Sequence, residues 1–239
     1  MMTTSAPKPR LLLFDFDGVI INSEPLMRFA FADTCRRCGV EPAPPVERFL
    51  ALMGMPLPAI VERLGLPRPF VAAYQALCKE RMDMVQLYDG ARAMLERGRA
   101  RFHALGLVTG KDRQRTLLLL ERFGLGDRFD AIVCGDDPHP GKPEPAAVAA
   151  LRLQFAAAAH ETYMVGDSPI DIECARRARV LAVGAAWGFS HVDELRRAGA
   201  HAIFSSPRAL ADWLGTTQRR SGRAATYPRT LSQRTGTDG

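Results

Sequence analysis

The chain has 239 residues, of which 47% are hydrophobic and 24% charged, and this composition is typical of a globular protein that buries a sizeable core. No apolar run reaches the ~18–20 residues of a membrane span, so we expect no membrane partner. The formal net charge of +6 would suit a nucleic-acid-binding protein only if it were spread over the folded body.

Most of that charge lies at the carboxyl end of the chain. From Gly215 onward five arginines oppose only Asp238, which gives this segment +4 and leaves about +2 for residues 1–214. The segment is rich in Ser, Thr, Gly and Arg, so we predict a disordered basic tail over residues 215–239. The nearly neutral body predicts no nucleic-acid partner.

A cytoplasmic location is the expectation from the amino-terminal residues and the cysteines. Leu11 to Phe14 is too short an apolar run for a secretory signal, which needs about 7–15 residues. The five cysteines are an odd number without a framework spacing, and Cys35 and Cys38 form a CxxC pair that no second pair accompanies. Free thiols in a reducing compartment are the better interpretation.

The first part of the chain predicts one strand followed by a helical insert. Residues 10–14 form an apolar run that predicts a buried strand, which ends at Asp15-Phe16-Asp17-Gly18. The pattern is then helical from 23 to 84, with prolines near the expected helix starts and no convincing strand. We therefore predict an all-helical insert, or cap, over residues 21–86.

Strands and helices alternate after Asp89-Gly90. We predict strands at 102–108, 131–134, 162–165, 180–183 and 202–204. We predict helices at 91–98, 113–123, 146–153, 170–178, 191–198 and 207–214. This alternation predicts an α/β fold, a Rossmann-like parallel sheet with helices on both faces, built from residues 1–20 and 87–214.

Polar residues follow four of the predicted strands: Asp15, Thr109, Lys142 and Asp167. Ligands of parallel sheets bind beyond the carboxyl ends of the strands, so we expect these residues to meet. A carboxylate nucleophile, a second acid, a divalent cation and groups that neutralise phosphoryl oxygens are the requirements of phosphoryl transfer. The set therefore predicts an enzyme that hydrolyses a phosphate ester.

Each predicted site residue has a role in that reaction. Asp15 is the expected nucleophile, and Asp17 the acid that protonates the leaving oxygen and then activates water. The carboxylates of Asp15 and Asp167, with the backbone carbonyl of Asp17, are the expected Mg²⁺ ligands, and Asp171 is expected to hold a metal-bound water. The predicted phosphate-binding groups are Thr109, the Gly110 N–H and Lys142.

The sequence resembles the haloacid dehalogenase-like hydrolase superfamily at four ordered signatures. These are Asp15-Phe16-Asp17-Gly18-Val19, Thr109, Gly141-Lys142-Pro143, and Gly166-Asp167-Ser168-Pro169-Ile170-Asp171. The resemblance covers roughly residues 10–214, and the helical insert is similar to the superfamily's small cap. It implies an aspartyl-phosphate intermediate, Mg²⁺ as cofactor and a small phosphorylated metabolite as substrate.

Within the superfamily the sequence is most similar to phosphoglycolate phosphatase-like proteins. Thr109-Gly110-Lys111 is shared with the branch associated with aminohydroxybenzoate biosynthesis, whereas most relatives carry Asn where Gly110 stands. The resemblance therefore implies a phosphoric monoester hydrolase. For the oligomeric state we expect a monomer or a homodimer.

The sequence also bears on functions other than a phosphatase. Asp17 disfavours a dehalogenase, which does not need the second acid, and the insert's only lysine, Lys79, disfavours a phosphonate hydrolase with a cap Schiff base. A phospho-accepting receiver domain is about half this length. A phosphosugar mutase and a non-catalytic scaffold or regulatory protein remain alternatives, although Met53-Gly54-Met55-Pro56 does not resemble a mutase cap loop.

Several polar or aromatic residues could serve either the site or the fold. Glu24 could orient Asp17 or cap a helix, and Trp187 could stack on substrate or pack against the sheet. Solvated surface roles are favoured for the remaining candidates, which are Asp136, Asp137, His139, Arg28, Arg48 and Arg63.

Overall fold

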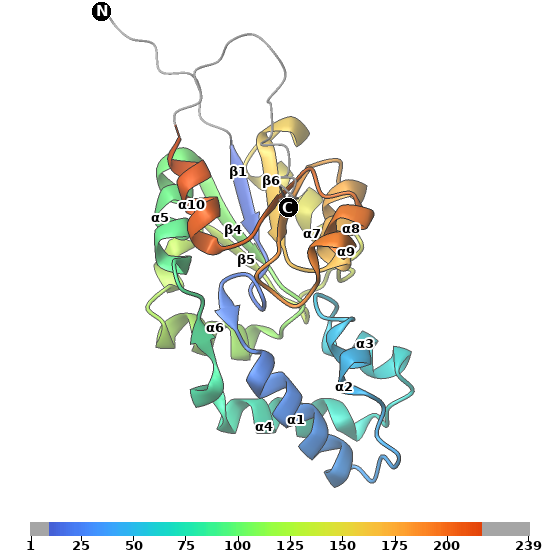
Figure 1. The fold of residues 1–239 in the computed structure, drawn as a ribbon. Coiled ribbons are helices and arrows are strands. Elements are labelled where there is room, and N and C mark those ends of the chain that lie inside the picture. Colours follow the sequence, from blue (N-terminus) through green and yellow to red (C-terminus); the bar gives the residue numbers. More distant parts are fainter. Residues whose placement is uncertain (1–9, 217–239) are drawn as a thin grey trace, which may run out of the picture.

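The centre of the protein is a six-stranded parallel sheet, seen in a computed structural model that describes residues 10–216 (Figure 1). The strand order is β5-β4-β1-β6-β7-β8. The strands are β1 (Leu11–Phe14), β4 (Ala104–Val108), β5 (Ala131–Val133), β6 (Thr162–Gly166), β7 (Leu181–Ala185) and β8 (Ala202–Phe204). The predicted α/β fold is confirmed, and the predicted tail lies outside the described residues except for Gly215 and Thr216.

Strand β1 shows how the sheet supplies two cores. Leu12 and Phe14 belong to one hydrophobic cluster, and Leu11 and Leu13 to the other, because successive side chains of a strand point to opposite faces. All four are fully buried, as expected for a parallel sheet that is covered on both sides.

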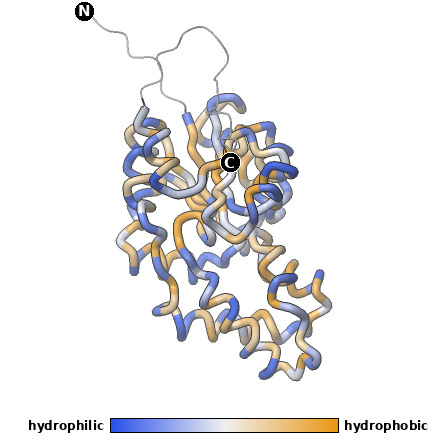
Figure 2. The backbone as a smooth tube through the Cα atoms, viewed as in Figure 1, coloured by the Kyte–Doolittle hydropathy of each residue, from blue (hydrophilic) through white to orange (hydrophobic). Residues whose placement is uncertain are grey.

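Helices cover both faces of the sheet (Figure 1). The Leu12 face packs against α5 (Ala91–Arg101), α6 (Arg113–Arg122) and α10 (Pro207–Gly215). The Leu11 face packs against α7 (Ala146–Gln154), α8 (Pro169–Arg177) and α9 (Val192–Ala198). In Figure 2 the hydrophobic stretches gather along the strands inside these two helical layers.

The boundary between α5 and β4 differs from the sequence prediction. The helix continues through Gly98 to Arg101, and the backbone N–H of Phe102 still donates to the Gly98 carbonyl oxygen. The strand therefore begins at Ala104 rather than at Phe102. A glycine is a common helix terminator, and this one misled the prediction because it lies inside the helix.

Residues 21–86, which we call the cap segment, lie beyond the carboxyl end of the sheet (Figure 1). Their helices are α1 (Glu24–Arg37), α2 (Val46–Leu50), α3 (Leu57–Arg63) and α4 (Pro69–Glu80). Two short antiparallel strands, β2 (Ile21–Asn22) and β3 (Gln86–Leu87), pair at the base of the segment. This ribbon departs from the predicted all-helical insert, because two-residue strands carry no readable periodicity in the sequence.

The interior of the cap segment is aromatic and continuous with the sheet. Phe31 and Phe49 have ring centroids 4.7 Å apart, and Phe70 stacks on Tyr74 at 5.9 Å. These rings belong to the same hydrophobic cluster as Leu12 of β1.

Three short 3-10 helices complete the described elements: Met82–Met84, Gly126–Arg128 and Ala159–Glu161. None of the helices within residues 10–216 has the length and hydrophobicity of a membrane span.

Candidate active site

The carboxyl ends of three adjacent strands and one loop bring the predicted residues together. Asp15 follows β1, Thr109 follows β4 and Asp167 follows β6, and all three are buried. Lys142 comes from the loop after β5 and is buried as well. The strand order reverses at β1: β4 and β5 lie on one side of it, and β6, β7 and β8 follow on the other. The site therefore lies at the point where a doubly wound sheet binds its ligands.

Three carboxylates form a tight buried cluster. Oxygen atoms of Asp15, Asp167 and Asp171 lie within 4.8 Å of one another. Burial raises the pKa of Asp15 to about 7, although Lys142 opposes the shift. Burial, together with the charges of Asp171 and Asp15, raises the pKa of Asp167 well above its usual range. The cluster thus holds more negative charge than its surroundings stabilise.

Lys142 is the cation of this cluster. Its Nζ lies 3.0 Å from Asp15 Oδ1 and 2.6 Å from Asp171 Oδ1. Burial lowers the pKa of Lys142, but these two carboxylates outweigh burial and hold the pKa above its usual value. The ammonium therefore stays charged and links the carboxylate after β1 to the first turn of α8.

Asp171 is fully engaged by protein groups. Oδ1 accepts from Lys142, and Oδ2 accepts from the Ser168 hydroxyl at 2.6 Å and the Ser168 N–H at 3.2 Å. Ser168 in turn accepts from the Asp171 N–H, which completes a capping box at the start of α8. Asp171 is therefore better placed to orient its neighbours than to bind a metal directly.

The donor set fits a hard divalent cation. Three buried carboxylates face one ammonium, and oxygen ligands of this kind suit Mg²⁺. Gly18 lies against the same place: it has a φ of +77°, and a Cβ there would stand 2.0 Å from Asp167 Oδ2. Only glycine allows the Asp15–Gly18 loop to turn this close to Asp167.

Asp17 lies apart from the carboxylate cluster. Its Oδ1 accepts a hydrogen bond from the hydroxyl of Ser23, just before α1, and its Oδ2 lies 3.1 Å from Lys111 Nζ. Both partners are buried or nearly so, so the Asp17 carboxylate has a fixed orientation. One contact comes from the cap segment and the other from the loop after β4.

The loop after β4 offers groups for an anion. Thr109 Oγ1 accepts from the Lys111 N–H at 3.2 Å, which leaves the hydroxyl hydrogen free to donate. Gly110 lies directly under the cap segment, since a Cβ there would stand 2.3 Å from the Met55 carbonyl oxygen and 2.5 Å from that of Gly54. An asparagine in place of Gly110 would collide with the cap segment in this position.

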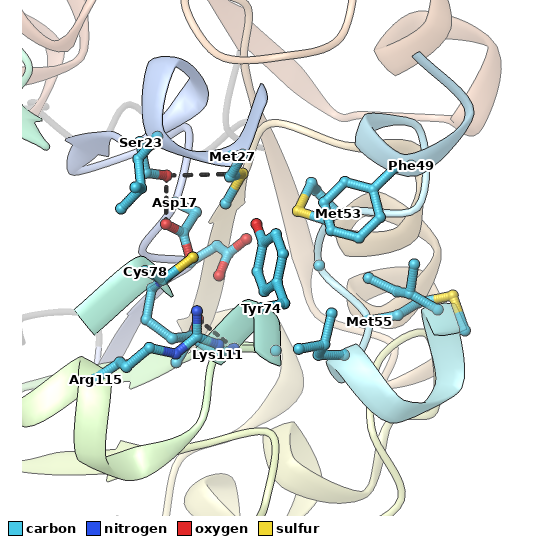
Figure 3. Close-up of a pocket in the computed structure, with 17 residues that line it drawn as sticks. Asp17, Ser23, Met27, Phe49, Met53, Met55, Tyr74, Cys78, Lys111 and Arg115 are labelled. Carbon is cyan, nitrogen blue, oxygen red and sulfur yellow. Dashed lines mark hydrogen bonds and ion pairs between the residues drawn. The ribbon is translucent and has the colours of Figure 1, made fainter. Parts of the chain in front are cut away.

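A pocket lies between the cap segment and these core residues (Figure 3). In this view Asp17 and Ser23 lie on one side, Met53 and Phe49 on the other, and Lys111 and Arg115 below. The lining residues are Asp15, Asp17, Ser23, Leu26, Met27, Phe49, Met53, Gly54, Met55, Leu57, Ile60, Tyr74, Cys78, Thr109, Gly110, Lys111 and Arg115.

Arg115 connects the core floor of the pocket to the cap segment. Its Nε lies 2.5 Å from Asp112 Oδ2, and its guanidinium lies 5.8 Å from the centroid of the Tyr74 ring. Gln75 of α4 also donates to Asp112 at 3.2 Å. Sequence analysis assigned no role to Arg115, Tyr74 or Ser23, because each acquires its place from a contact with a distant segment.

The contacts of Glu24 and Trp187 distinguish between the two roles that each could have. Glu24 is paired with Arg28, and it is Ser23 rather than Glu24 that contacts Asp17. The Trp187 indole N–H donates to the Val19 carbonyl oxygen at 3.0 Å, so this ring packs between core loops.

The other candidates named from sequence lie outside the pocket. Asp136 accepts from the Arg113 N–H and Asp137 pairs with the Arg113 side chain, which gives both a structural role. The remaining three, His139, Arg48 and Arg63, are exposed.

Comparisons with known proteins show the family of the chain. Residues 12–185 match the family model described as haloacid dehalogenase-like hydrolase. A phosphoglycolate phosphatase of Rhodospirillum rubrum is 30% identical over an alignment that covers 92% of this chain and 97% of that protein. One of Pseudomonas fluorescens is 29% identical over 77% of this chain and 71% of that protein.

Solved structures share the fold. A hydrolase from Pseudomonas syringae superposes with a TM-score of 0.77 at 22% identity, covering 86% of this chain and 97% of that one. A haloacid dehalogenase-like family hydrolase from Streptococcus pneumoniae gives 0.74 at 21% identity, covering 85% and 97%.

Proposed function

Because the chain belongs to the haloacid dehalogenase-like hydrolase family, we propose that it is a Mg²⁺-dependent phosphatase that hydrolyses a small phosphomonoester metabolite. The observation that carries the proposal is that the carboxylates of Asp15 and Asp17 lie in different environments. Asp15 lies within the buried carboxylate cluster beside Lys142, while Asp17 is held outside that cluster by Ser23 and Lys111.

In the first step the Asp15 carboxylate attacks the phosphorus of the bound ester. The bond between phosphorus and the ester oxygen breaks, and the leaving oxygen takes a proton from Asp17. Among residues 10–216 the hydrogen bonds of the Asp15 carboxylate, from the Phe16 N–H at 2.7 Å and from Lys142, fall on Oδ1. Oδ2 is therefore the attacking oxygen, and an aspartyl-phosphate forms.

In the second step Asp17 removes a proton from water, and the water oxygen attacks the same phosphorus. Phosphate leaves, and Asp15 and the protonated form of Asp17 are regenerated. Lys142 and the hydroxyl of Thr109, with the Gly110 N–H, neutralise phosphoryl oxygens during both steps. Asp15, Asp167 and the Asp17 carbonyl would hold Mg²⁺, which supplies charge stabilisation to the transferring group.

We also propose that residues 21–86 form a mobile cap on a core made of residues 1–20 and 87–214. The cap segment carries Gly54 and Met55 directly over Gly110, so it covers part of the site in this arrangement. Substrate entry requires the cap to open, with the β2–β3 ribbon at its base as the hinge region. We further propose that the enzyme is cytoplasmic and that it acts as a monomer or a homodimer.

The alternatives have less support from the site. A phosphosugar mutase must bind a second phosphate, yet no charged side chain of the cap segment lines the pocket. A non-catalytic scaffold would not need a complete set of acids, cation and hydroxyl in a closed pocket. The resemblance to phosphoglycolate phosphatases favours hydrolysis of a monoester over both.

Release of phosphate from p-nitrophenyl phosphate and a panel of phosphorylated metabolites tests the proposal, with and without Mg²⁺. We expect Mg²⁺-dependent turnover that Asp15→Asn abolishes and that the matched surface variant Asp127→Asn retains, since the Asp127 side chain is 87% exposed. Acid quenching of the wild-type protein should trap phosphate on Asp15. Full activity of Asp15→Asn would exclude the mechanism, and absence of Mg²⁺-dependent release from any ester would exclude the function.

A further inference from the structure

The wall that the cap segment contributes to the pocket is mainly apolar. Its apolar side chains are Leu26, Met27, Phe49, Met53, Met55, Leu57 and Ile60, supplemented by the Tyr74 ring and the Cys78 thiol. Ser23 of the same segment also lines the pocket, and its hydroxyl donates to Asp17. Every charged side chain that lines the pocket comes from the core instead: Asp15, Asp17, Lys111 and Arg115. The pocket is therefore charged on the core side, where the phosphate binds, and apolar on the cap side, where the rest of the substrate must lie.

The cap segment's own cations do not reach this wall. Arg28 is exposed and pairs with Glu24 at 2.8 Å and with Glu47 at 3.0 Å. The two cations that line the pocket lie on its core side, where Lys111 is 3.1 Å from Asp17 and Arg115 is 2.5 Å from Asp112. A carboxylate placed among the cap side chains would lose its hydration without a cation of the cap segment beside it.

We infer that the substrate is a phosphomonoester of an apolar alcohol, with a hydrocarbon or aromatic body that packs against the cap wall. This inference rests on the proposed phosphatase function and specifies its substrate class. A two-carbon hydroxy-acid phosphate such as phosphoglycolate would leave the apolar wall unfilled and put its carboxylate against it.

The wall is built to adapt to such a body. In the closed arrangement the pocket has a free volume of about 40 Å³, enough for a few water molecules. Met27, Met53 and Met55 are unbranched and flexible, so they can repack around a larger group when the cap closes on substrate. The water they displace has poor hydrogen-bonding partners on this side, which makes its release favourable.

A homologous series of esters tests the inference with the full chain and saturating Mg²⁺. Ethyl, butyl and hexyl phosphate have similar leaving alkoxides and differ mainly in apolar length. We expect kcat/KM to rise by about three- to fourfold for each methylene that becomes fully buried. Phosphoglycolate and 2-hydroxyethyl phosphate should be at least tenfold poorer than hexyl phosphate; a flat series, or a preference for phosphoglycolate, would overturn the inference.

Variants connect the preference to the wall. Met53→Gln and Met27→Gln should flatten the dependence on chain length. Leu153→Gln, an 83% exposed position on α7, should leave the dependence unchanged. A slope that survives both methionine substitutions would place the apolar contacts elsewhere and contradict the assignment.

A binding measurement separates failure of this inference from failure of the proposed function. Alkyl phosphonates cannot be hydrolysed, and calorimetric titration of the Mg²⁺-loaded protein should give affinities that increase from ethyl- to hexylphosphonate and exceed that of 3-phosphonopropionate. Length-dependent binding without turnover of any ester would overturn the phosphatase but keep the apolar site. Turnover of esters without length-dependent binding would keep the phosphatase function and overturn the apolar site.

Discussion

Asp15 and Asp17 are two positions apart in the sequence but lie in different environments. Asp15 shares Lys142 with Asp171 inside the carboxylate cluster, and its pKa is raised to about 7 by burial. Asp17 instead contacts Ser23 and Lys111. Two carboxylates in separate environments can divide nucleophilic and acid–base roles between them.

Replacement of Asp17 tests this division. Asp17→Asn keeps the shape and the contact with Ser23 but removes the proton that the leaving group needs. We expect kcat to fall by ~10²–10⁴, and the loss should be smaller for p-nitrophenyl phosphate, whose leaving group needs less protonation. An equal loss for alkyl and p-nitrophenyl esters would argue that Asp17 has another role.

Lys142 is expected to stabilise the fold as well as the site. Without it, Asp15 and Asp171 would remain buried beside Asp167 and lose their common cation. Removal of one member of a buried ion pair costs ~3–5 kcal/mol. We therefore expect Lys142→Met to lower the free energy of unfolding by about that amount in urea with a chelator present, whereas Lys79→Met at an exposed position should change it little.

At the scale of elements, the position of the cap segment depends on its contacts with the core. Met55 and Gly54 press on Gly110, Gln75 of α4 donates to Asp112, and Arg122 of α6 donates to the Val85 carbonyl oxygen at 3.2 Å. These contacts join segments that are more than 30 residues apart in the chain. Changes in the loop after β4 should therefore act on the cap as much as on the phosphate.

Gly110→Ala tests that coupling. The added Cβ would stand 2.3 Å from the Met55 carbonyl oxygen, so the cap segment must shift outward. We expect kcat/KM to fall by ~10–100-fold, the order of cost of a displacement of about 1 Å in an active site. Gly126→Ala is the matched control, because a Cβ there meets no atom within 4 Å. Similar kinetics for the two variants would show that closure does not depend on this contact.

At the scale of the whole molecule, one hydrophobic cluster extends from β1 through the cap segment. Leu12, Phe31 and Phe70 all belong to it. The carboxylate cluster lies at the junction of the two parts, so a cation bound there should stabilise the entire fold.

Thermal unfolding in Mg²⁺ measures this effect. A ligand at 100 times its Kd stabilises the native state by about 2.7 kcal/mol, which corresponds to a rise in Tm of about 5–10 °C for a domain of this size. Asp167→Asn should abolish most of the rise, and Asp127→Asn should retain it. An unchanged rise in Asp167→Asn would place the cation at a different site.

The sequence by itself determined the sheet and the clustering of Asp15, Thr109, Lys142 and Asp167 around its carboxyl edge. Alternating apolar runs and helical stretches are local signals, and parallel strands end at one edge whatever their order. Polar residues that stand just after a run, such as Asp15, Thr109 and Asp167, therefore meet at that edge, and Lys142 joins them from the loop after another run. Gly98 shows the limit of such signals, because a residue that suits a helix end lies within α5.

Only the tertiary structure decided how that cluster is enclosed. Ser23 and Lys111 meet at Asp17 although 88 positions separate them, and Tyr74 meets Arg115 across the pocket. These contacts depend on the angle at which the cap segment packs on the core, and residue periodicity carries no information about that angle. The apolar wall is a consequence of the same packing: Met27, Met53 and Ile60 would each be assigned to an ordinary core from sequence, and they line a pocket because the cap segment lies over Asp15.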